Sequence, residues 1–461
     1  MVTTLDFVVL SIYLLLVLII GIYSSKREHL EGYLANNRRT KLYLLTFSNV
    51  ATFIGAGAVV TVASAAYTTG ISYALVVIIS LVIACLLYAL LSSKIKRFGD
   101  TTRAYTIGHF LDYRYGKSTK YTFSFFYVLL AFLWMAIQFV AIAQLLKILL
   151  GVNFIFALLA SVIVTIIYTS LAGLISDILT DFFQFWVMLL TFLILVPLLW
   201  IKSDGLATLA ALPSTYFDPL AFGGISFLIG GILLSGLVLI PSVHYWQRIY
   251  AAESATTSRK SFLYSIPSVI FFVAASAIIG LFAVSLVPQG DPDSILFVLM
   301  ATYLPSGLLG LCFAGIIAVV MSSIDSLLIG GSATILKDIY QPLFKPKAQE
   351  HELLNMVRYI TVIFGLIGAL VAFFFQSIVT LSLLTAFTAL CFVPALIGGL
   401  FWKRATSTAS VSSLLISLVV LYVLFPFMPK TAFLPSFLVA VLVFVLVSFF
   451  SKHAPSEHIG S

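Results

Sequence analysis

Four side-chain oxygen donors stand close together in one apolar stretch of the chain. Residues 314–332, AGIIAVVMSSIDSLLIGGS, carry Ser322, Ser323, Asp325 and Ser326 within about one helical turn. On a helix, positions three and four apart share a face, so Ser322, Asp325 and Ser326 line one strip. An aspartate at the centre of a bilayer costs about 2.5 to 3.5 kcal/mol and therefore usually faces a cavity, a partner or an ion. The stretch predicts an oxygen-lined cation site; the alternative is serines that bond back to carbonyls four residues earlier.

The composition indicates that this stretch lies in a membrane. Hydrophobic residues make up 61% of the chain, charged residues 9%, and the mean hydropathy is +1.15, which excludes a water-soluble globular domain. Apolar runs of about 20 residues suit transmembrane helices, whereas barrel strands are about 10 residues long and alternate. We therefore expect an all-α multi-pass membrane protein. Cys85, Cys312 and Cys391 lie singly in apolar segments and are interpreted as small core residues.

The apolar runs predict thirteen transmembrane helices. The first run has no Lys or Arg before it and the basic residues after it, so we interpret it as a retained helix and not a signal peptide. The predicted spans are 5–23, 43–66, 73–92, 121–149, 153–170, 178–200, 223–246, 262–286, 306–336, 353–376, 378–402, 408–426 and 432–450.

The basic residues predict the orientation of these helices. When the spans are threaded alternately, nearly all Lys and Arg fall on one side, and Lys147, Lys202 and Lys430 fall on the other. The positive-inside rule then places the N-terminus outside and the C-terminus in the cytoplasm of a cell-membrane protein. The net charge of +8 needs no nucleic-acid partner, because its placement follows the lipid bilayer.

Apart from Asp177, Asp181 and Asp325, every Asp and Glu falls in a predicted loop, a terminus or the extreme end of a predicted helix. Asp177 and Asp181 stand one turn apart where the span 178–200 begins, and Asp325 lies inside 306–336. No Lys or Arg is predicted near the middle of the membrane, so we expect no structural ion pair for Asp181 or Asp325. The possible partners of Asp181 and Asp325 are then each other, hydroxyl groups, water or a bound cation.

Two of the spans are predicted to be interrupted. Residues 51–58, ATFIGAGA, place two glycines in one span, and Pro241 lies late in another. Glycine and proline free backbone groups that protein, water or a ligand must then satisfy. The alternative is close helix packing through small residues.

The two interruptions divide the chain into repeats. Each falls in the first helix of a five-span block, which is the pattern of inverted repeats in secondary transporters. The predicted divisions are an extra N-terminal helix with a cytoplasmic loop at 1–42, a first repeat at 43–200, an extracellular loop at 201–222, a second repeat at 223–402, and two extra helices with a short cytoplasmic tail at 403–461.

Four motifs resemble those of the sodium:solute symporter family across essentially the whole chain. They are ATFIGAGA from Ala51, AGLISDILTDFFQ from Ala172, YWQR ending at Arg248, and AVVMSSIDSLLIGGSATILKDIY from Ala318. The resemblance implies a leucine-transporter-type core of five plus five helices and coupling to sodium. It also implies one sodium site made by the carbonyls of Ala51, Ile54 and Val319 and the hydroxyls of Ser322 and Ser323.

Some family members hold a second sodium, and the resemblance extends to that site in part. It implies ligands at Asp181, Ser322 and Ser326, while Asp325 stands where those members carry a serine. We therefore expect a second cation site at Asp181, Asp325 and Ser326 in which sodium and a proton compete. The alternative is that Asp325 points past the site and bonds to a neighbouring helix or to water.

The motifs do not identify the solute, because carriers of choline, proline and pantothenate share much of the same motif pattern. Because no cationic side chain is expected at mid-membrane, we expect a neutral, zwitterionic or cationic solute of the amino-acid or quaternary-ammonium type, with Phe53 and Trp134 offering aromatic faces. Pantothenate, urea or a small monocarboxylate is the alternative. The residues expected to line the solute site are Phe53, Gly55, Gly57, Trp134, Gln138, Ser242 and Tyr245.

The sequence disfavours two other classes of protein. An intramembrane enzyme would have Asp177, Asp181, His244 and Asp325 as its acids and bases, but no nucleophile motif or metal-ligand spacing accompanies them. A sensor would need a signalling module, for which the residues after the last span leave no room. We therefore expect a non-enzymatic symporter, and the sequence makes no prediction of oligomeric state.

Overall fold

A computed structural model describes residues 2–25, 29–171 and 173–451 of the chain. Helices form nearly all of the described part, and its one β-contact is an isolated parallel bridge between Thr40 and Ala252. Among these described residues, ten helices are long and apolar enough to cross a membrane, or eleven when the bent pair α3–α4 is counted as one span. These observations confirm an all-α, multi-pass membrane protein.

The helices of the first half are α1 (Thr4–Ser25), α2 (Leu30–Ala35), η1 (Asn36–Arg38), α3 (Leu42–Phe53), α4 (Ala56–Thr69), α5 (Ser72–Thr102), α6 (Ile107–Tyr115), α7 (Lys117–Leu150), α8 (Phe154–Leu171), α9 (Leu174–Lys202), α10 (Leu206–Ala211) and η2 (Ser214–Phe217). Those of the second half are α11 (Gly224–Leu234), η3 (Ser235–Leu237), α12 (Val243–Ala251), α13 (Ala255–Leu286), η4 (Pro292–Ser294), α14 (Ile295–Tyr303), α15 (Leu308–Thr334), the π-helical turn η5 (Ile335–Tyr340), α16 (Gln341–Phe344), α17 (Glu350–Phe374), α18 (Ile378–Leu390), α19 (Val393–Phe401), α20 (Ser407–Leu424) and α21 (Phe433–Phe450).

The predicted count of thirteen spans is not reached by length and composition alone. The difference lies at two places. The predicted span 153–170 corresponds to α8, whose apolar stretch is counted as a shorter helix, and the predicted span 223–246 is broken into α11, η3 and α12. Both regions are helical, so the disagreement concerns which helices cross and not where helices form.

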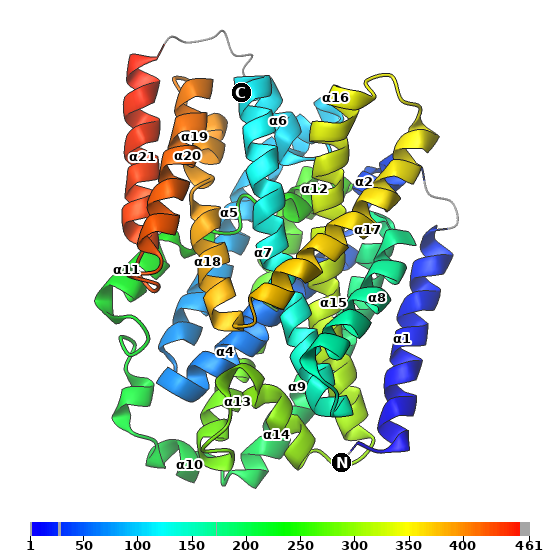
Figure 1. Cartoon of the computed structure of the whole chain (residues 1–461), viewed down its shortest axis with the longest axis vertical. Helices are drawn as coiled ribbons and strands as arrows, with labels where there is room; N and C mark the ends of the chain where they lie inside the picture. Colours follow the sequence, from blue (N-terminus) through cyan, green and yellow to red (C-terminus); the bar gives the residue numbers. More distant parts are fainter. Residues whose placement is uncertain (1, 26–28, 172, 452–461) are drawn as a thin grey trace.

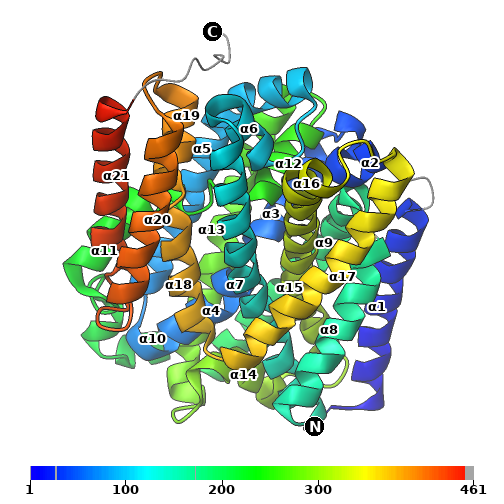
Figure 2. The ribbon, with the colours of Figure 1, turned by 45° about the horizontal axis from the view of Figure 1, so that its top comes forward.

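The long helices surround α15. Every residue of α15 from Ala314 to Thr334 is buried, and the helix packs against α1, α7, α9 and α17. In Figures 1 and 2, α1 lies at one edge of the bundle and the pair α20 and α21 lies at the opposite edge, with α15 between them. The helix that carries the clustered oxygens is therefore the centre of the fold, which explains why it tolerates polar residues that lipid would not.

The first predicted interruption separates α3 from α4, and the two helices meet at an angle of 44°. Ile54 leaves helical geometry with φ −94° and ψ 69°, and Gly55 is extended. The side-chain oxygen of Gln138 on α7 accepts a hydrogen bond of 2.9 Å from the Ala56 N–H, the first of α4. A backbone donor that the break frees is thus satisfied by protein.

The second predicted interruption lies between η3 and α12. Residues 238–242 are not helical, and Pro241 and Ser242 lead into α12, which is buried over its whole length. Proline cannot donate the hydrogen bond that a continuing helix would need. Both interruptions predicted from glycine and proline are therefore present.

Candidate functional site

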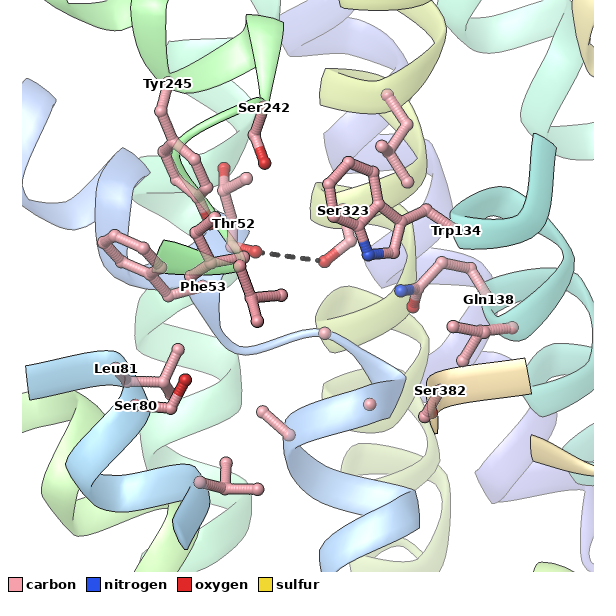
Figure 3. A pocket seen from close by; sticks show the side chains of 18 of the residues that line it. Thr52, Phe53, Ser80, Leu81, Trp134, Gln138, Ser242, Tyr245, Ser323 and Ser382 are labelled. Carbon is pink, nitrogen blue, oxygen red and sulfur yellow. Dashed lines mark hydrogen bonds between the residues drawn. The ribbon is translucent and has the colours of Figure 1, made fainter. Parts of the chain in front are cut away.

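The two interruptions line one cavity of about 190 Å³. Its wall contains Phe53, Gly55 and Gly57 from the α3–α4 break, and Ser242 and Tyr245 from the start of α12. Figure 3 shows Phe53 and Tyr245 on one side of the cavity and Trp134, Gln138 and Ser382 on the other. All seven residues that the sequence predicted for the solute site line this cavity, namely Phe53, Gly55, Gly57, Trp134, Gln138, Ser242 and Tyr245.

Aromatic rings form much of the cavity wall. Phe53 and Tyr245 stack on each other with ring centroids 4.4 Å apart, so the two broken helices are in direct contact. Trp134 lies edge-on to His244 at 6.2 Å, and His244 is tilted against Tyr245 at 4.4 Å. The cavity wall therefore presents a flat, rigid surface against which an apolar group could pack.

The oxygens of α15 meet the broken end of α3 beside this cavity. The Ser322 hydroxyl donates to the carbonyl of Ala51 at 2.9 Å and to that of Val319 at 3.1 Å. The Ser323 hydroxyl lies 3.4 Å from the carbonyl of Thr52 and 3.5 Å from that of Val319, and Figure 3 shows the contact with Thr52. The last carbonyls of α3 have lost their helical partners, and the serines of α15 take their place.

This arrangement fits a sodium ion by the chemistry of its donors. Hydroxyl and carbonyl oxygens suit a hard cation, and both kinds meet here in a buried position. Of the predicted ligands, Ala51, Val319, Ser322 and Ser323 are brought together by hydrogen bonds, and the buried Ile54 directly follows α3. Ser323, one of the predicted sodium ligands, also lines this cavity, so the two predicted sites adjoin.

The side chains of Ser323 on α15 and Gln138 on α7 approach Gly55 closely. A Cβ on Gly55 would lie 2.5 Å from the Ser323 Oγ and 3.0 Å from the Gln138 Nε2. The same substitution at Gly57 meets nothing nearer than the Ser382 Oγ at 3.7 Å. Only the first of these glycines therefore touches the predicted sodium ligands.

A second polar group, which we call the Arg248 cluster, comprises Arg248, Asp177, Asp181, Ser48 and Ser326. One guanidinium nitrogen of Arg248 lies 2.9 Å from Asp177, 2.7 Å from Asp181 and 2.8 Å from the Ser326 hydroxyl, while its Nε donates to Ser48 at 2.9 Å. Ser48 in turn donates to Asp181 at 2.6 Å. The side chains of Arg248 and both aspartates are fully buried, and the cluster joins α3, α9, α12 and α15.

The Arg248 cluster corrects one expectation. We expected no ion pair for Asp181, because the predicted span 223–246 ends before Arg248 and places that residue on the cytoplasmic side. The break at 238–242 instead lets α12 continue to Ala251 inside the protein, which brings Arg248 to the two aspartates. Burying the arginine and both carboxylates together costs far less free energy than burying any one of these charges alone, because the hydrogen bonds between them offset the lost hydration.

The expected second cation site is divided between two groups of contacts. Asp181 and Ser326 belong to the Arg248 cluster, whereas Asp325 accepts a short hydrogen bond from the Thr169 hydroxyl on α8. Successive helix residues are turned by about 100°, so Ser326 lies about 40° to one side of Ser322 and Asp325 about 60° to the other. Asp325 and Ser326, which were expected on one face of the helix, therefore contact different neighbouring helices. Asp325 takes the stated alternative and bonds to a neighbouring helix.

Sequence reasoning missed His244 as a cavity residue and the roles of Ser48, Thr52 and Arg248. A signal for Arg248 was present, because two aspartates one turn apart in an apolar segment need a counter-charge and the YWQR motif supplies one. No sequence signal identifies Ser48, whose part depends on how α3 packs against α9.

The chain is similar in sequence to known sodium symporters. The family model described as the sodium:solute symporter family matches residues 33–417. The sodium/pantothenate symporter of Haemophilus influenzae is 26% identical, over 86% of this chain and 84% of the relative. A sodium/proline symporter of Staphylococcus aureus is 23% identical, over 97% of this chain and 93% of the relative.

Solved structures share the fold. A substrate-bound, outward-open Na⁺-coupled sialic acid symporter superposes with a TM-score of 0.86 at 20% identity, over 99% of this chain and 100% of that chain. Mhp1, a transporter of the nucleobase-cation-symport-1 family, gives a TM-score of 0.63 at 15% identity, over 90% and 94%. Because the family model matches residues 33–417, well over half of the chain, the chain belongs to the sodium:solute symporter family.

Proposed function

We propose that this protein is a symporter that uses a sodium gradient to import a small organic solute by alternating access. The observation that carries the proposal is the junction of α3 and α15, where hydroxyls of Ser322 and Ser323 meet carbonyls of Ala51 and Thr52 beside a cavity lined by both broken helices. A cation at this junction is placed to hold the two helices together.

The proposed sodium ligands are the carbonyls of Ala51, Ile54 and Val319 and the hydroxyls of Ser322 and Ser323. When sodium binds, the serine hydroxyls turn their lone pairs to the ion, and the ion replaces the hydrogen bonds that now join α3 to α15. Loss of sodium to the cytoplasm releases both helices. Because the α3–α4 break carries Phe53 and Gly55 into the cavity, sodium also fixes the wall against which the solute binds.

This shared element gives coupling without direct contact between ion and solute. If sodium stabilises the break in the conformation that binds solute, then solute must raise the affinity for sodium by the same factor. Coupling free energies of this kind are typically about 1 to 3 kcal/mol, or roughly 5-fold to 150-fold in affinity.

We further propose that the Arg248 guanidinium supplies the positive charge that a second sodium supplies in some family members. It contacts Asp181 and Ser326, two of the three residues expected for that site. This chain would then carry one sodium per solute, and Asp325 would serve α8 packing through Thr169. The competition between sodium and a proton expected at Asp181 and Asp325 loses its support.

We also propose the membrane orientation and the repeat structure inferred from the sequence. The N-terminus lies outside, the C-terminus in the cytoplasm, and the blocks 43–200 and 223–402 form the two inverted repeats. Support comes from the position of the two breaks in the first helix of each block, and from α1 beginning at the end of the molecule opposite to that where α21 ends (Figure 1).

The test is uptake into proteoliposomes across a panel of radiolabelled solutes. The panel contains L-proline, pantothenate, choline, urea and propionate, and each is measured with an inward sodium gradient and with potassium in place of sodium. We expect at least one solute to accumulate only with the sodium gradient and to be released when monensin collapses it. Accumulation that is equal in sodium and potassium would contradict sodium coupling.

A further inference from the structure

Two polar atoms at the start of α12 lack hydrogen-bond partners in the described part of the chain. They are the Ser242 hydroxyl and the Nδ1 of His244, on residues that are 0% and 5% exposed. Both residues line the cavity, and Figure 3 shows the Ser242 hydroxyl pointing into the space between Tyr245 and Ser323. Buried polar groups are nearly always paired, so two orphans on one wall point to a ligand that pairs them.

The position of Ser242 suits an anionic group. Ser242 precedes α12, a helix of nine residues, but its hydroxyl makes no cap hydrogen bond to the helix. The N-terminus of a helix carries a partial positive charge and favours anions. The hydroxyl is therefore a free donor at the positive end of a helix.

A third donor lies across the cavity on α7. The oxygen of the Gln138 amide already accepts the N–H of Ala56 at 2.9 Å, which fixes the amide orientation. Its Nε2 is left on the side of Gly55, where an added Cβ would approach it to 3.0 Å. Gln138 thus presents an N–H₂ donor to the cavity that Ser242 and His244 also line.

The cavity has donors but no charged side chain among the described residues that line it. An anion placed there needs a counter-charge, and the proposed sodium provides one because Ser323, a proposed sodium ligand, also lines the cavity. A cationic solute would be repelled by the positive N-terminus of α12 and by the sodium ion, and no acidic side chain among the described lining residues would offset that repulsion. The electrostatics favour a negative group on the solute.

We infer that the solute carries a carboxylate, which Ser242 and His244 hold at the start of α12 while its apolar body packs against Phe53 and Tyr245. The inference rests on the proposed sodium symport, since sodium is the counter-charge. It narrows the expected solutes to zwitterionic amino acids and small monocarboxylates, and removes quaternary ammonium compounds that lack an acid group. The attraction between ion and carboxylate in a buried site adds directly to the coupling.

The experiment measures binding of matched acid and amide probes to the purified full-length protein in nanodiscs. The pairs are L-proline with L-prolinamide and propionate with propionamide, and choline is the cation without an acid. Thermal stabilisation is followed at saturating sodium and in potassium. We expect an acid to bind in sodium at least tenfold more tightly than its amide and than choline, and the two pairs distinguish a zwitterion from a monocarboxylate.

Variants connect that binding to the residues. Ser242→Ala removes a donor to a charged group and should weaken binding of the acid by about tenfold to a hundredfold, and His244→Gln should weaken it less. Ser242→Ala should not lower the thermal stability of the ligand-free protein, because its orphan hydroxyl has no partner to lose. Ser276→Ala is the matched control, since Ser276 is a buried serine of α13 outside the cavity lining and donates to the carbonyl of Phe272 at 2.8 Å.

The outcomes separate this inference from the proposed function. Sodium-dependent binding of choline or of an amide with the affinity of its acid would overturn the carboxylate inference and leave sodium symport standing. Parental affinity for the acid in both Ser242→Ala and His244→Gln would also overturn it. Acid binding that is equal in sodium and potassium, but lost in Ser242→Ala, would uphold the carboxylate site and contradict sodium symport.

Discussion

Replacement of Gly55 with alanine tests how the break between α3 and α4 presents the sodium ligands. The added Cβ would lie 2.5 Å from the Ser323 Oγ, 3.2 Å from the Ser323 Cβ and 3.0 Å from the Gln138 Nε2. A contact of 2.5 Å is too short to persist, so the Ser323 hydroxyl must rotate away. It then leaves the carbonyls of Thr52 and Val319, which it now approaches at 3.4 and 3.5 Å.

The backbone itself accepts the change. Gly55 has φ −93° and ψ −173°, an extended conformation that alanine adopts readily, so the fold should remain intact. The loss is one of the proposed sodium oxygens, and we expect sodium affinity to fall by about tenfold or more, or about 1.4 kcal/mol. Folding without sodium should stay near that of the parent.

The assay is the sodium dependence of thermal stability in purified protein, with potassium holding the ionic strength constant. Gly57→Ala is the matched control, because its Cβ would make an ordinary contact of 3.7 Å with the Ser382 Oγ and should retain the parent's sodium affinity. Equal sodium affinity in Gly55→Ala and the parent would refute the proposal that Ser323 ligates sodium at this break.

Two further substitutions test the polar groups around α15. Arg248→Met leaves the two buried aspartates of the Arg248 cluster without a counter-charge and should destabilise the protein by about 3 to 5 kcal/mol. Arg248→Lys should have an intermediate effect, and thermal unfolding in detergent measures both. A Met variant as stable as the parent would show that the cluster does not stabilise the fold. Asp325→Asn keeps an acceptor for Thr169, so its sodium affinity and the pH dependence of transport should match the parent, whereas a tenfold loss would restore Asp325 as an ion ligand.

The sequence predicted features that depend on local backbone chemistry. Gly55 and Pro241 marked both breaks, because glycine and proline act on the chain where they stand. The family resemblance of the motif around Ser322 and Ser323 implied that both meet the end of α3, and both hydroxyls do lie against its carbonyls. Of the predicted cavity residues, Phe53, Gly55, Gly57, Ser242 and Tyr245 lie at or next to those two breaks.

Features that depend on packing between distant helices were not predictable in the same way. Arg248 was misplaced because span lengths were counted as if the helix were continuous, and five non-helical residues carry it into the interior. Asp325 and Ser326 are neighbours in sequence, yet α8 takes one and α9 the other. Which helix lies on which side of α15 is decided by the whole fold and not by the spacing of its residues.

The most direct test of the central claim is solute affinity measured as a function of sodium, in the parent and in the Ser322→Ala/Ser323→Ala variant. The double substitution removes two proposed oxygen ligands and the hydrogen bonds of 2.9 and 3.4 Å to α3, with little change in volume. We predict that the parent binds solute at least tenfold more tightly as sodium rises, and that the folded double variant needs at least tenfold more sodium for the same effect. An unchanged sodium dependence in the double variant would contradict the account, since the coupling ion would then lie elsewhere.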